Sequence, residues 1–262
     1  MFLLCNPIVW QHQHTYAHHS FTNDFDHDPD LHHFDNLVRV HRRFKHYPVY
    51  KNQKNFWFVV LAYAFVVFGT CFWIPLGMLR DGSLYGIVEW TDRKRPLRAA
   101  GMFLHLIGYA GFIMVLPFWT LPWYKALAAA MVHLATSGLS FAFFSQINHL
   151  NEASLADEAT RAKRSASRDR RLAKSWAVEQ IETSNNFCTD SFSWHIVSNG
   201  LNLQIEHHLF PGLNHCHLHH IAPVVQETCR EFGVFYKEYS GWTDIVQATL
   251  TWLDKLADEP DQ

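Results

Sequence analysis

The sequence predicts an all-α integral membrane protein with a helical cap on the cytosolic side, and three observations indicate this fold class. Three long segments, 56–79, 99–124 and 126–151, contain no Asp, Glu, Lys or Arg. Basic residues gather outside these runs and are almost absent between the second and the third. Most of the 19 histidines lie in two polar zones, 12–46 and 195–220, that flank the apolar runs.

Composition excludes several other classes of protein. Charged residues make up 18% of the 262 residues, against about 25% in soluble domains. The formal net charge of −2 provides no positive field that would collect nucleic acid, so no nucleic-acid partner is expected. Five cysteines without a C-x-x-C pair indicate neither a disulfide framework nor a thiolate zinc site.

The second and third apolar runs, 99–124 and 126–151, are expected to form a transmembrane hairpin. A run of 26 helical residues covers ~39 Å, whereas the hydrocarbon core of a bilayer is ~30 Å thick. Cytoplasmic loops carry an excess of Lys and Arg, and only Lys125 separates these two runs. Their short connection, near 121–125, is therefore expected on the far side of the membrane.

The first run, 56–79, is expected to be re-entrant or to lie in the membrane interface. Segment 39–54 before it holds six Lys and Arg residues, and segment 80–98 after it holds five. A single crossing would place one of these basic segments on the far side, against the positive-inside rule. Pro75 and Gly77 are expected to break the helix of this run.

Two histidine clusters could bind a metal ion. The first holds three histidines that share or adjoin one helical face: His14, His18 and His19. The second holds a glutamine three and four residues before a histidine pair: Gln204, His207 and His208. Imidazole suits iron, copper, nickel and zinc, so the ligand type alone does not select the metal.

The number of membrane crossings decides whether the two clusters can meet. With two crossings between them, both clusters face the cytosol and could form one site, whereas three crossings would separate them. His12 is an alternative to His14 as the leading ligand. An alternative is a second metal site at His215, His217, His219 and His220, and His105 and His133 are functional candidates because they lie in apolar runs. We expect ordinary structural roles for all six.

The residues around both clusters resemble the front-end type of membrane fatty acid desaturase. The third histidine box of that family is similar to Gln204-Ile-Glu-His-His-Leu-Phe-Pro211, preceded by Asn199-Gly-Leu-Asn202 and followed by His219-His-Ile-Ala-Pro223. The second box is similar to His14-x-x-x-His18-His19, followed by Thr22-Asn23 and Asp28-Pro-Asp30. An additional family histidine resembles the last residue of Gln146-Ile-Asn-His149. The resemblance covers nearly the whole chain.

The resemblance implies an oxygen-dependent enzyme that introduces a cis double bond into an acyl chain during polyunsaturated fatty acid synthesis. It implies two iron ions in an almost all-histidine shell facing the cytosol, in the endoplasmic reticulum membrane. Electrons would come from cytochrome b5 and its reductase, and the substrate would be an acyl-CoA or an acyl-lipid. The implied ligands are His14, His18, His19, His149, His207 and His208, with Gln204 in or next to the ligand shell. Removing hydrogen from an unactivated methylene needs a cofactor, which the protein must position.

Two family features are not found in the sequence. No H-x-x-x-H segment, which would be the first histidine box, occurs ahead of His14, and no His-Pro-Gly-Gly haem motif of a fused cytochrome b5 domain occurs. We therefore expect a single desaturase-like domain, 1–262, that is incomplete at its amino end and lacks two iron ligands.

Residues 152–262 are expected to form the cytosolic cap. Its basic run, 161–174, is expected to be a solvated face. An amphipathic helix is expected over 221–232 with Gly233 as its stop, and Thr243 is expected to cap a last helix.

Other functions remain open from the sequence. A sphingolipid desaturase or a related di-iron hydroxylase would use a similar scaffold. An alternative of another class is a truncated, non-catalytic membrane protein. An H-x-x-x-H segment upstream in the reading frame would indicate truncation, and its absence from the transcript would favour the non-catalytic alternative.

Overall fold

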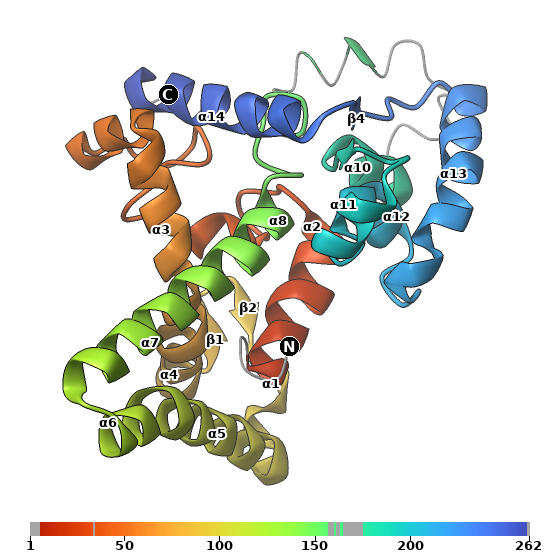
Figure 1. Ribbon diagram of the computed structural model, residues 1–262. Coiled ribbons are helices and arrows are strands. Elements are labelled where there is room, and N and C mark those ends of the chain that lie inside the picture. Colours follow the sequence, from red (N-terminus) through yellow and green to blue (C-terminus); the bar gives the residue numbers. More distant parts are fainter. Residues whose placement is uncertain (1–5, 34, 157–159, 161–162, 165–174, 261–262) are drawn as a thin grey trace. The chain divides into compact units, whose positions relative to one another are not determined.

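The computed structural model describes residues 6–33, 35–156, 160, 163–164 and 175–260, and its regular structure is almost entirely helical (Figure 1). The chain divides into two compact units. The first comprises Met1–Val38 and Asn55–Phe143, and the second comprises Arg39–Lys54 and Phe144–Gln262. The basic run 161–174 lies outside the described residues apart from Lys163 and Arg164.

The first unit consists of long helices and one small hairpin. Its elements are α1 (Pro7–Trp10), η1 (Gln11–His18), α2 (His19–Phe21), η2 (Pro29–His33), α3 (Phe56–Phe68), η4 (Gly69–Trp73), α4 (Ile74–Asp81), β1 (Ser83–Leu84), β2 (Val88–Glu89), η5 (Thr91–Lys94), α5 (Pro96–Ala110), η6 (Gly111–Val115), α6 (Leu116–Thr120), α7 (Trp123–Ser137) and η7 (Gly138–Phe143). The strands β1 and β2 pair antiparallel. The segments η1, η4, η6 and η7 are π-helical and join their α-helical neighbours into continuous helices.

Residues 56–81 form one continuous helix made of α3, η4 and α4. The expected break at Pro75 and Gly77 is wrong, because the chain stays helical through both residues and ends at Gly82, which has a left-handed φ of 72°. A proline removes one helical N–H donor and crowds the preceding turn. The wider π turn of η4 lies directly before Pro75 and accommodates that crowding.

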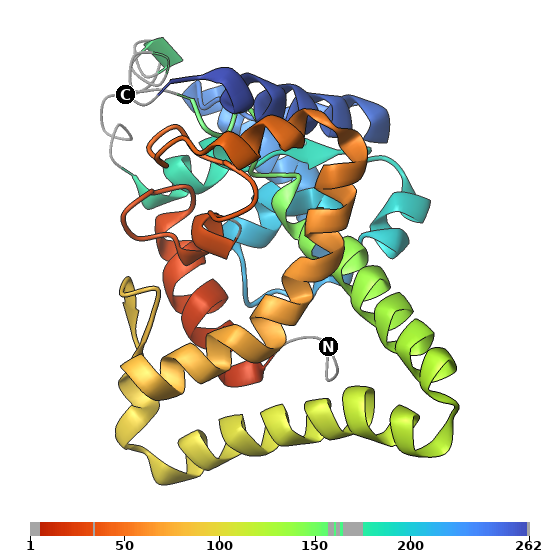
Figure 2. The same ribbon diagram turned by 90° about the vertical axis from the view of Figure 1, so that its left-hand side faces the viewer.

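Among the described residues, two helices are long and apolar enough to cross a membrane: Pro96–Thr120 and Trp123–Gln146. They correspond to the predicted runs 99–124 and 126–151, and each begins three residues earlier than predicted. Only 24% and 28% of their apolar windows are buried. A core helix of a water-soluble protein would be covered by protein, so lipid is the covering that suits these helices. In Figure 2, α5 and α7 diverge from the turn that joins them.

The helix of α7 and η7 approaches α3 so closely that only glycine fits at position 138. A Cβ atom at Gly138 would lie 2.3 Å from the carbonyl oxygen of Tyr63 and 2.6 Å from that of Ala64. Small residues permit this kind of backbone approach between helices in a membrane. The helix 56–81 is therefore packed directly against the second apolar helix.

The second unit combines short helices with two long ones. Its elements are η3 (Pro48–Lys54), α8 (Phe144–Gln146), α10 (Trp176–Glu182), β3 (Asn186–Phe187), α11 (Phe192–Val197), η9 (Leu201–Leu203), α12 (Gln204–Leu209), η10 (His215–His217), α13 (Leu218–Phe232), β4 (Glu238–Tyr239) and α14 (Trp242–Asp258). The strands β3 and β4 pair in parallel. The predicted helix over 221–232 is α13, which begins three residues earlier and ends at Gly233 as predicted.

The start of α14 differs from the prediction. The expectation that Thr243 caps this helix is wrong, because Gly241 is the N-cap and Thr243 lies inside the helix. The carboxylate of Asp244 accepts the N–H of Gly241 at 3.0 Å. Asp244, in the first turn, thus satisfies the N–H of the cap residue, as the acidic residue of a capping box does.

The basic segment 39–54 belongs to the second unit because it packs on α14. Arg39 is fully buried, and its guanidinium donates to the carbonyl oxygens of Phe44 (2.8 Å) and Leu256 (3.4 Å). A cation suits the carbonyl end of a helix. The indole of Trp252 donates to the carbonyl oxygen of Val40 at 2.9 Å. The residues expected to form the cap therefore share their unit with segment 39–54.

Candidate metal centre

The first histidine cluster lies where its helix is wound as a π-helix. The N–H of His19 donates to the carbonyl oxygen of His14, which is the i to i+5 hydrogen bond of a π-helix. Residues five apart then lie one above the other, so His14 and His19 share a face and His18 adjoins it. The side chain of Asn6 caps the start of this helix and donates to the carbonyl oxygen of Met102 at 3.0 Å. These contacts fix the direction in which the cluster points.

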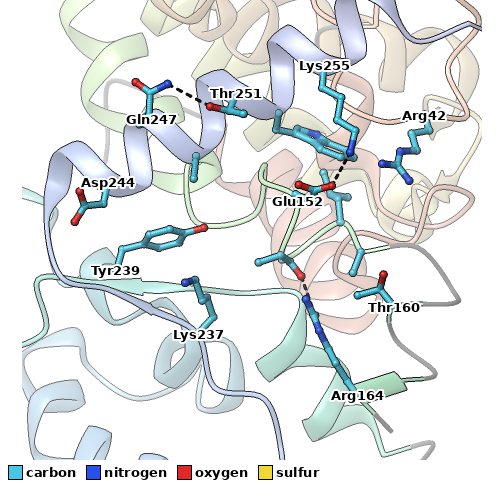
Figure 3. A pocket seen from close by; sticks show the side chains of 15 residues that line it. Arg42, Glu152, Thr160, Arg164, Lys237, Tyr239, Asp244, Gln247, Thr251 and Lys255 are labelled. Carbon is cyan, nitrogen blue, oxygen red and sulfur yellow. Dashed lines mark hydrogen bonds and ion pairs between the residues drawn. The ribbon is translucent and has the colours of Figure 1, made fainter. Parts of the chain in front are cut away.

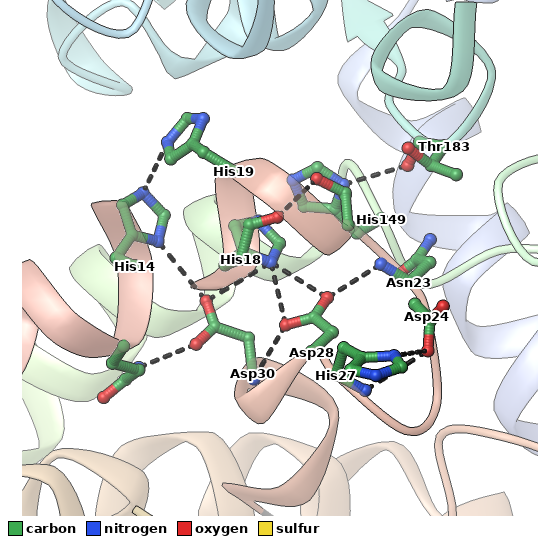
Figure 4. Close-up of polar contacts among 12 residues, drawn as sticks. His14, His18, His19, Asn23, Asp24, His27, Asp28, Asp30, His149 and Thr183 are labelled. Carbon is green, nitrogen blue, oxygen red and sulfur yellow. Dashed lines mark hydrogen bonds and ion pairs between the residues drawn. The ribbon is translucent and has the colours of Figure 1, made fainter. Parts of the chain in front are cut away.

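An acidic turn holds the Nδ1 atoms of two of these histidines (Figure 4). Nδ1 of His18 lies 3.0 Å from Oδ2 and 3.1 Å from Oδ1 of Asp28, and Nδ1 of His14 lies 3.3 Å from Oδ2 of Asp30. Asp28 is fully buried and also accepts the backbone N–H of Asn23 at 2.7 Å. A histidine whose Nδ1–H donates to a carboxylate carries its lone pair on Nε2, and such pairs orient many metal-binding histidines.

Burial and the two carboxylates set the charge of this cluster. Burial lowers the pKa of His14, and the nearby Asp30 offsets this only in part. Burial also disfavours charge on His18, but Asp28 and Asp30 outweigh it and raise the pKa of His18 to about 9. Burial by itself would raise the pKa of Asp30, yet His18 and hydrogen bonds from His14 and His33 hold that pKa well below its usual range. The two nearby carboxylates favour positive charge on the imidazoles, whether it comes from a proton or from a metal ion.

The metal-facing nitrogens of the cluster lie close together. Nε2 of His14 and Nε2 of His19 are 3.2 Å apart. Two nitrogens that each lie ~2.1 Å from one metal ion, at right angles, would be ~3.0 Å apart, so this separation fits two ligands of one ion. His14, His18 and Asp30 also offer three donor atoms within 4.8 Å of one another. Asp30 approaches the Nδ1 side of both rings, so its geometry is that of an orienting group.

Neutral acceptors orient His208 of the second cluster and also His149, the additional histidine of the family resemblance. Nδ1 of His149, which follows α8, lies 2.9 Å from the carbonyl oxygen of Thr183 (Figure 4). Nδ1 of His208 lies 2.8 Å from Oε1 of Gln180 in α10. The ring centroids of His149 and His208 are 4.6 Å apart. Because a carbonyl oxygen can only accept, each Nδ1 carries the proton and each Nε2 carries the lone pair.

His207 is oriented through a second histidine. Its Nδ1 lies 3.1 Å from Nε2 of His215, and Nδ1 of His215 lies 2.6 Å from the carbonyl oxygen of Asn199. The carbonyl makes Nδ1 of His215 a donor, so Nε2 of His215 accepts from His207 and leaves the lone pair of His207 on Nε2. Gly200 permits this contact, because a Cβ atom there would lie 2.8 Å from Cβ of His215. The structural role expected for His215 is therefore to orient His207.

Gln204 lies on the side of His149 that would face a metal. Its Nε2 is 3.1 Å from Nε2 of His149, and its Oε1 accepts a hydrogen bond from Asn148 at 3.3 Å. Nε2 is the nitrogen of His149 that carries the lone pair. This position fits the expectation that Gln204 lies in or next to a ligand shell.

The helix that carries the histidine pair, α12, is anchored by Glu206. This fully buried carboxylate accepts from Nδ2 of Asn186 at 2.7 Å and from the hydroxyl of Tyr236 at 3.0 Å. Burial raises the pKa of Glu206, while hydrogen bonds from Asn186 and Tyr236 favour its ionised form. The anchor ties α12 to β3 and to the segment before β4, and it fixes the position of His207 and His208.

The ring nitrogens of His12, the alternative leading ligand, lie near groups outside the histidine cluster. Nδ1 of His12 lies 2.9 Å from the carbonyl oxygen of Ile8, and its Nε2 lies 3.3 Å from Oγ1 of Thr91. This geometry gives His12 the structural role of joining its helix to η5.

Two of the other prominent histidines each lie close to a polar side chain. Nδ1 of His105 lies 3.5 Å from Nδ2 of Asn6, and Nε2 of His133 lies 3.1 Å from the hydroxyl of Tyr109. Three further histidines are exposed, and within the described part of the chain they belong to no set of three converging metal donors: His217, His219 and His220.

Five of the six candidate ligands share one arrangement, in which a protein group holds Nδ1 and leaves Nε2 as the nitrogen that would face a metal. They are His14, His18, His149, His207 and His208. Imidazole nitrogens oriented in this way fit iron, among other transition metals. The sequence did not reveal the orienting groups Gln180 and Thr183, because they lie 28 and 34 residues from the histidines they hold.

Comparisons with known proteins point to one family. The family model of the fatty acid desaturases matches residues 1–240. The sn-1 linoleoyl-lipid 6-desaturase of Synechocystis sp. is 27% identical over 262 residues, which cover 97% of this chain and 68% of that protein. The acyl-lipid (8-3)-desaturase of Physcomitrium patens is 31% identical over 255 residues, which cover 96% of this chain and 50% of that protein.

A third relative extends the range of organisms. The acyl-lipid (8-3)-desaturase of Mortierella alpina is 28% identical over 238 residues, which cover 87% of this chain and 49% of that protein. The chain thus spans about half to two thirds of the length of these relatives. No solved structure matches the chain.

Proposed function

The chain belongs to the fatty acid desaturase family, and from that premise we propose that it is an oxygen-dependent front-end acyl desaturase with two iron ions. The reaction would introduce a cis double bond between an existing one and the carboxyl end of the acyl chain. The iron ligands in this proposal are His14, His18, His19, His149, His207 and His208, with Gln204 in or next to the ligand shell.

The two histidine clusters belong to different units, and we propose that they meet at one centre. An even number of membrane crossings between them would bring both to the same face of the membrane. The proposed arrangement keeps one domain over 1–262, a transmembrane hairpin at about 99–124 and 126–151, and a re-entrant or interfacial run at 56–79. Residues 152–262 would form the cap, on the cytosolic face of the endoplasmic reticulum.

The observation that carries this proposal is the common orientation of the histidines. Nδ1 is held by Asp30, Asp28, Thr183, His215 or Gln180, which leaves Nε2 of each ring as the nitrogen that would face a metal. Bound iron would supply the oxidising power that an unactivated methylene requires and that side chains lack. The chain's own contribution is to fix the rings before the metal binds and to place the carboxyl groups of Asp28 and Asp30 behind the ligands, where they favour a bound cation.

The substrate and partners follow from the same premise. The three relatives described above are named for lipid-linked acyl groups, so we propose an acyl-lipid substrate for this chain. Oxygen would be the co-substrate, and cytochrome b5 with its reductase would supply two electrons. The apolar surface of the helices 96–120 and 123–146 supports a bilayer as the surrounding medium.

Expression in a host without front-end desaturases, supplied with linoleic acid, tests the proposed reaction. The wild-type chain is expected to produce a fatty acid with one new double bond on the carboxyl side, identified by mass spectrometry of derivatised esters. His208→Ala is expected to abolish this product at equal protein level. His220→Ala, which changes an exposed histidine outside the proposed ligand set, is the matched control and is expected to retain it.

The outcomes separate the competing functions. A wild-type chain that accumulates with bound iron but yields no new double bond would contradict desaturation and leave the metal centre standing. A hydroxylated acyl chain would instead favour the di-iron hydroxylase. Product formed equally by His208→Ala and wild type would refute the assigned site.

A further inference from the structure

The second unit carries a pocket of about 670 Å³ whose lining includes none of the candidate iron ligands (Figure 3). Four cationic side chains from separate segments line it: Arg42, Arg164, Lys237 and Lys255. Two aromatic rings line it as well, those of Tyr239 and Trp252, together with apolar side chains such as Leu155 and Ala248.

Three of the four cations lie over aromatic rings. The guanidinium carbon of Arg42 is 5.1 Å from the ring centroid of Trp252, and Nζ of Lys237 is 4.3 Å from that of Tyr239. The guanidinium carbon of Arg164 is 4.1 Å from the ring centroid of Phe235. A ring face holds a cation in place without neutralising it. These ring contacts hold three cationic groups at the pocket.

Two carboxylates also line the pocket, Glu152 and Asp244, and two of its four cations are ion-paired. Glu152 pairs with Lys255 at 2.6 Å, and Asp244 accepts the N–H of Gly241 at 3.0 Å. Arg42 pairs with Glu259 at 3.3 Å. Among the described residues, no carboxylate lies within ion-pair distance of Lys237, whose ammonium contacts the Tyr239 ring. The charge of Lys237 is thus the one that an incoming anion would meet.

We propose that this pocket binds the phosphate group of an amphipathic organic phosphate. Lys237 would make the main contact with the phosphate, since charge-assisted hydrogen bonds to phosphate are strong. The Tyr239 and Trp252 rings and Leu155 would contact the planar or apolar part of the same molecule. A phosphomonoester of a thioester carrier and a phosphodiester of a lipid head group share this chemistry. That the bound molecule is the head of the acyl substrate rests on the proposed function, whereas phosphate binding does not.

Calorimetric titration of the full chain in a maltoside detergent tests the site. The probes are adenosine 3′,5′-bisphosphate, glycerophosphocholine and inorganic phosphate. One organic phosphate is expected to bind more tightly than inorganic phosphate. Lys237→Gln is expected to weaken that binding by about tenfold or more, because it removes a charged hydrogen-bond donor. Lys237→Arg is expected to retain binding, which excludes a mere folding defect.

Lys51→Gln is the matched control, because Lys51 is an exposed lysine of the same unit outside the pocket. It is expected to bind the probes as the wild type does. Preference for the bisphosphate would identify a phosphomonoester carrier, and preference for glycerophosphocholine a lipid head group, and either supports the site. No binding, binding of inorganic phosphate alone, or equal binding by wild type and Lys237→Gln would overturn it. Because no turnover is measured, organic phosphate binding by a chain that proves inactive would refute the proposed function and leave this site standing.

Discussion

Replacement of Asp28 by asparagine tests whether this carboxylate orients His18 for a metal. In the buried native carboxylate, Oδ2 accepts the N–H of Asn23 at 2.7 Å, Oδ1 accepts the N–H of Asp30 at 2.9 Å, and both oxygens face Nδ1 of His18. Asparagine replaces one of the two oxygens by an NH₂ donor. Whichever way the amide is turned, this donor faces the backbone N–H of either Asn23 or Asp30. One buried donor then loses its acceptor, at a cost of about 1–3 kcal/mol. His18 also loses its charged partner, so iron affinity is expected to fall about 10–100-fold.

The assay for Asp28→Asn is the affinity of the purified chain for Fe(II) in a chelator-buffered series. Asp24→Asn is the matched control, because Asp24 accepts from Nδ1 of His27 at 3.0 Å in an exposed pair outside the proposed ligand set. The control is expected to keep wild-type affinity. An affinity of Asp28→Asn within about threefold of the wild type, against the 10–100-fold loss typical for such partners, would refute the orienting role.

Three further predictions rest on other parts of the structure. The pKa of His18 is raised to about 9, so iron must displace a proton from this histidine at pH 7. Iron affinity is therefore expected to rise with pH and to level off above that pKa. An iron affinity that does not change with pH would contradict this. Gly138→Ala is expected to destabilise the chain by about 1–3 kcal/mol through overpacking. Gly111→Ala is the control and is expected to be neutral or stabilising, because nothing lies within 4 Å of a Cβ atom at that position. Equal melting temperatures of the two variants would count against the close approach of the helices at Gly138. Glu206→Ala is expected to lower iron content because Tyr236 and the strand β3 lose their buried acceptor. Glu206→Gln is expected to restore part of the iron content. Full iron content in Glu206→Ala would show that this anchor does not position the histidine pair.

Five of the six candidate ligands could be found from the sequence because they are close neighbours within each cluster, whereas His149 follows only from the resemblance to the family. His14, His18 and His19 lie within six residues, and one helix brings them together whether it is wound as an α-helix or as a π-helix. The groups that orient them depend on tertiary contacts. Gln180 and Thr183 carry no local signal, and their contacts with histidines exist only once α10 has packed beside α12 and the residues after α8.

The two apolar spans were predicted well because their signal, a long run without charge, does not depend on packing. The break predicted at Pro75 was wrong because the π turn at Gly69–Trp73 makes room for the proline ring within the helix. The presence of a proline in the sequence does not by itself reveal such a π turn. The joining of segment 39–54 to α14 was not foreseen either. It depends on Arg39, whose buried guanidinium contacts a carbonyl 217 residues away.

The most direct measurement of the proposed centre is the iron content per chain of detergent-purified protein. Wild type is to be compared with His18→Ala, His208→Ala and the exposed control His220→Ala. If both clusters hold the same centre, the wild type and the control contain about two iron ions per chain, and each of the other variants loses iron although each changes a different cluster. Wild-type iron content in either ligand variant, or a wild-type chain with no iron above background, would contradict a shared histidine-bound iron centre.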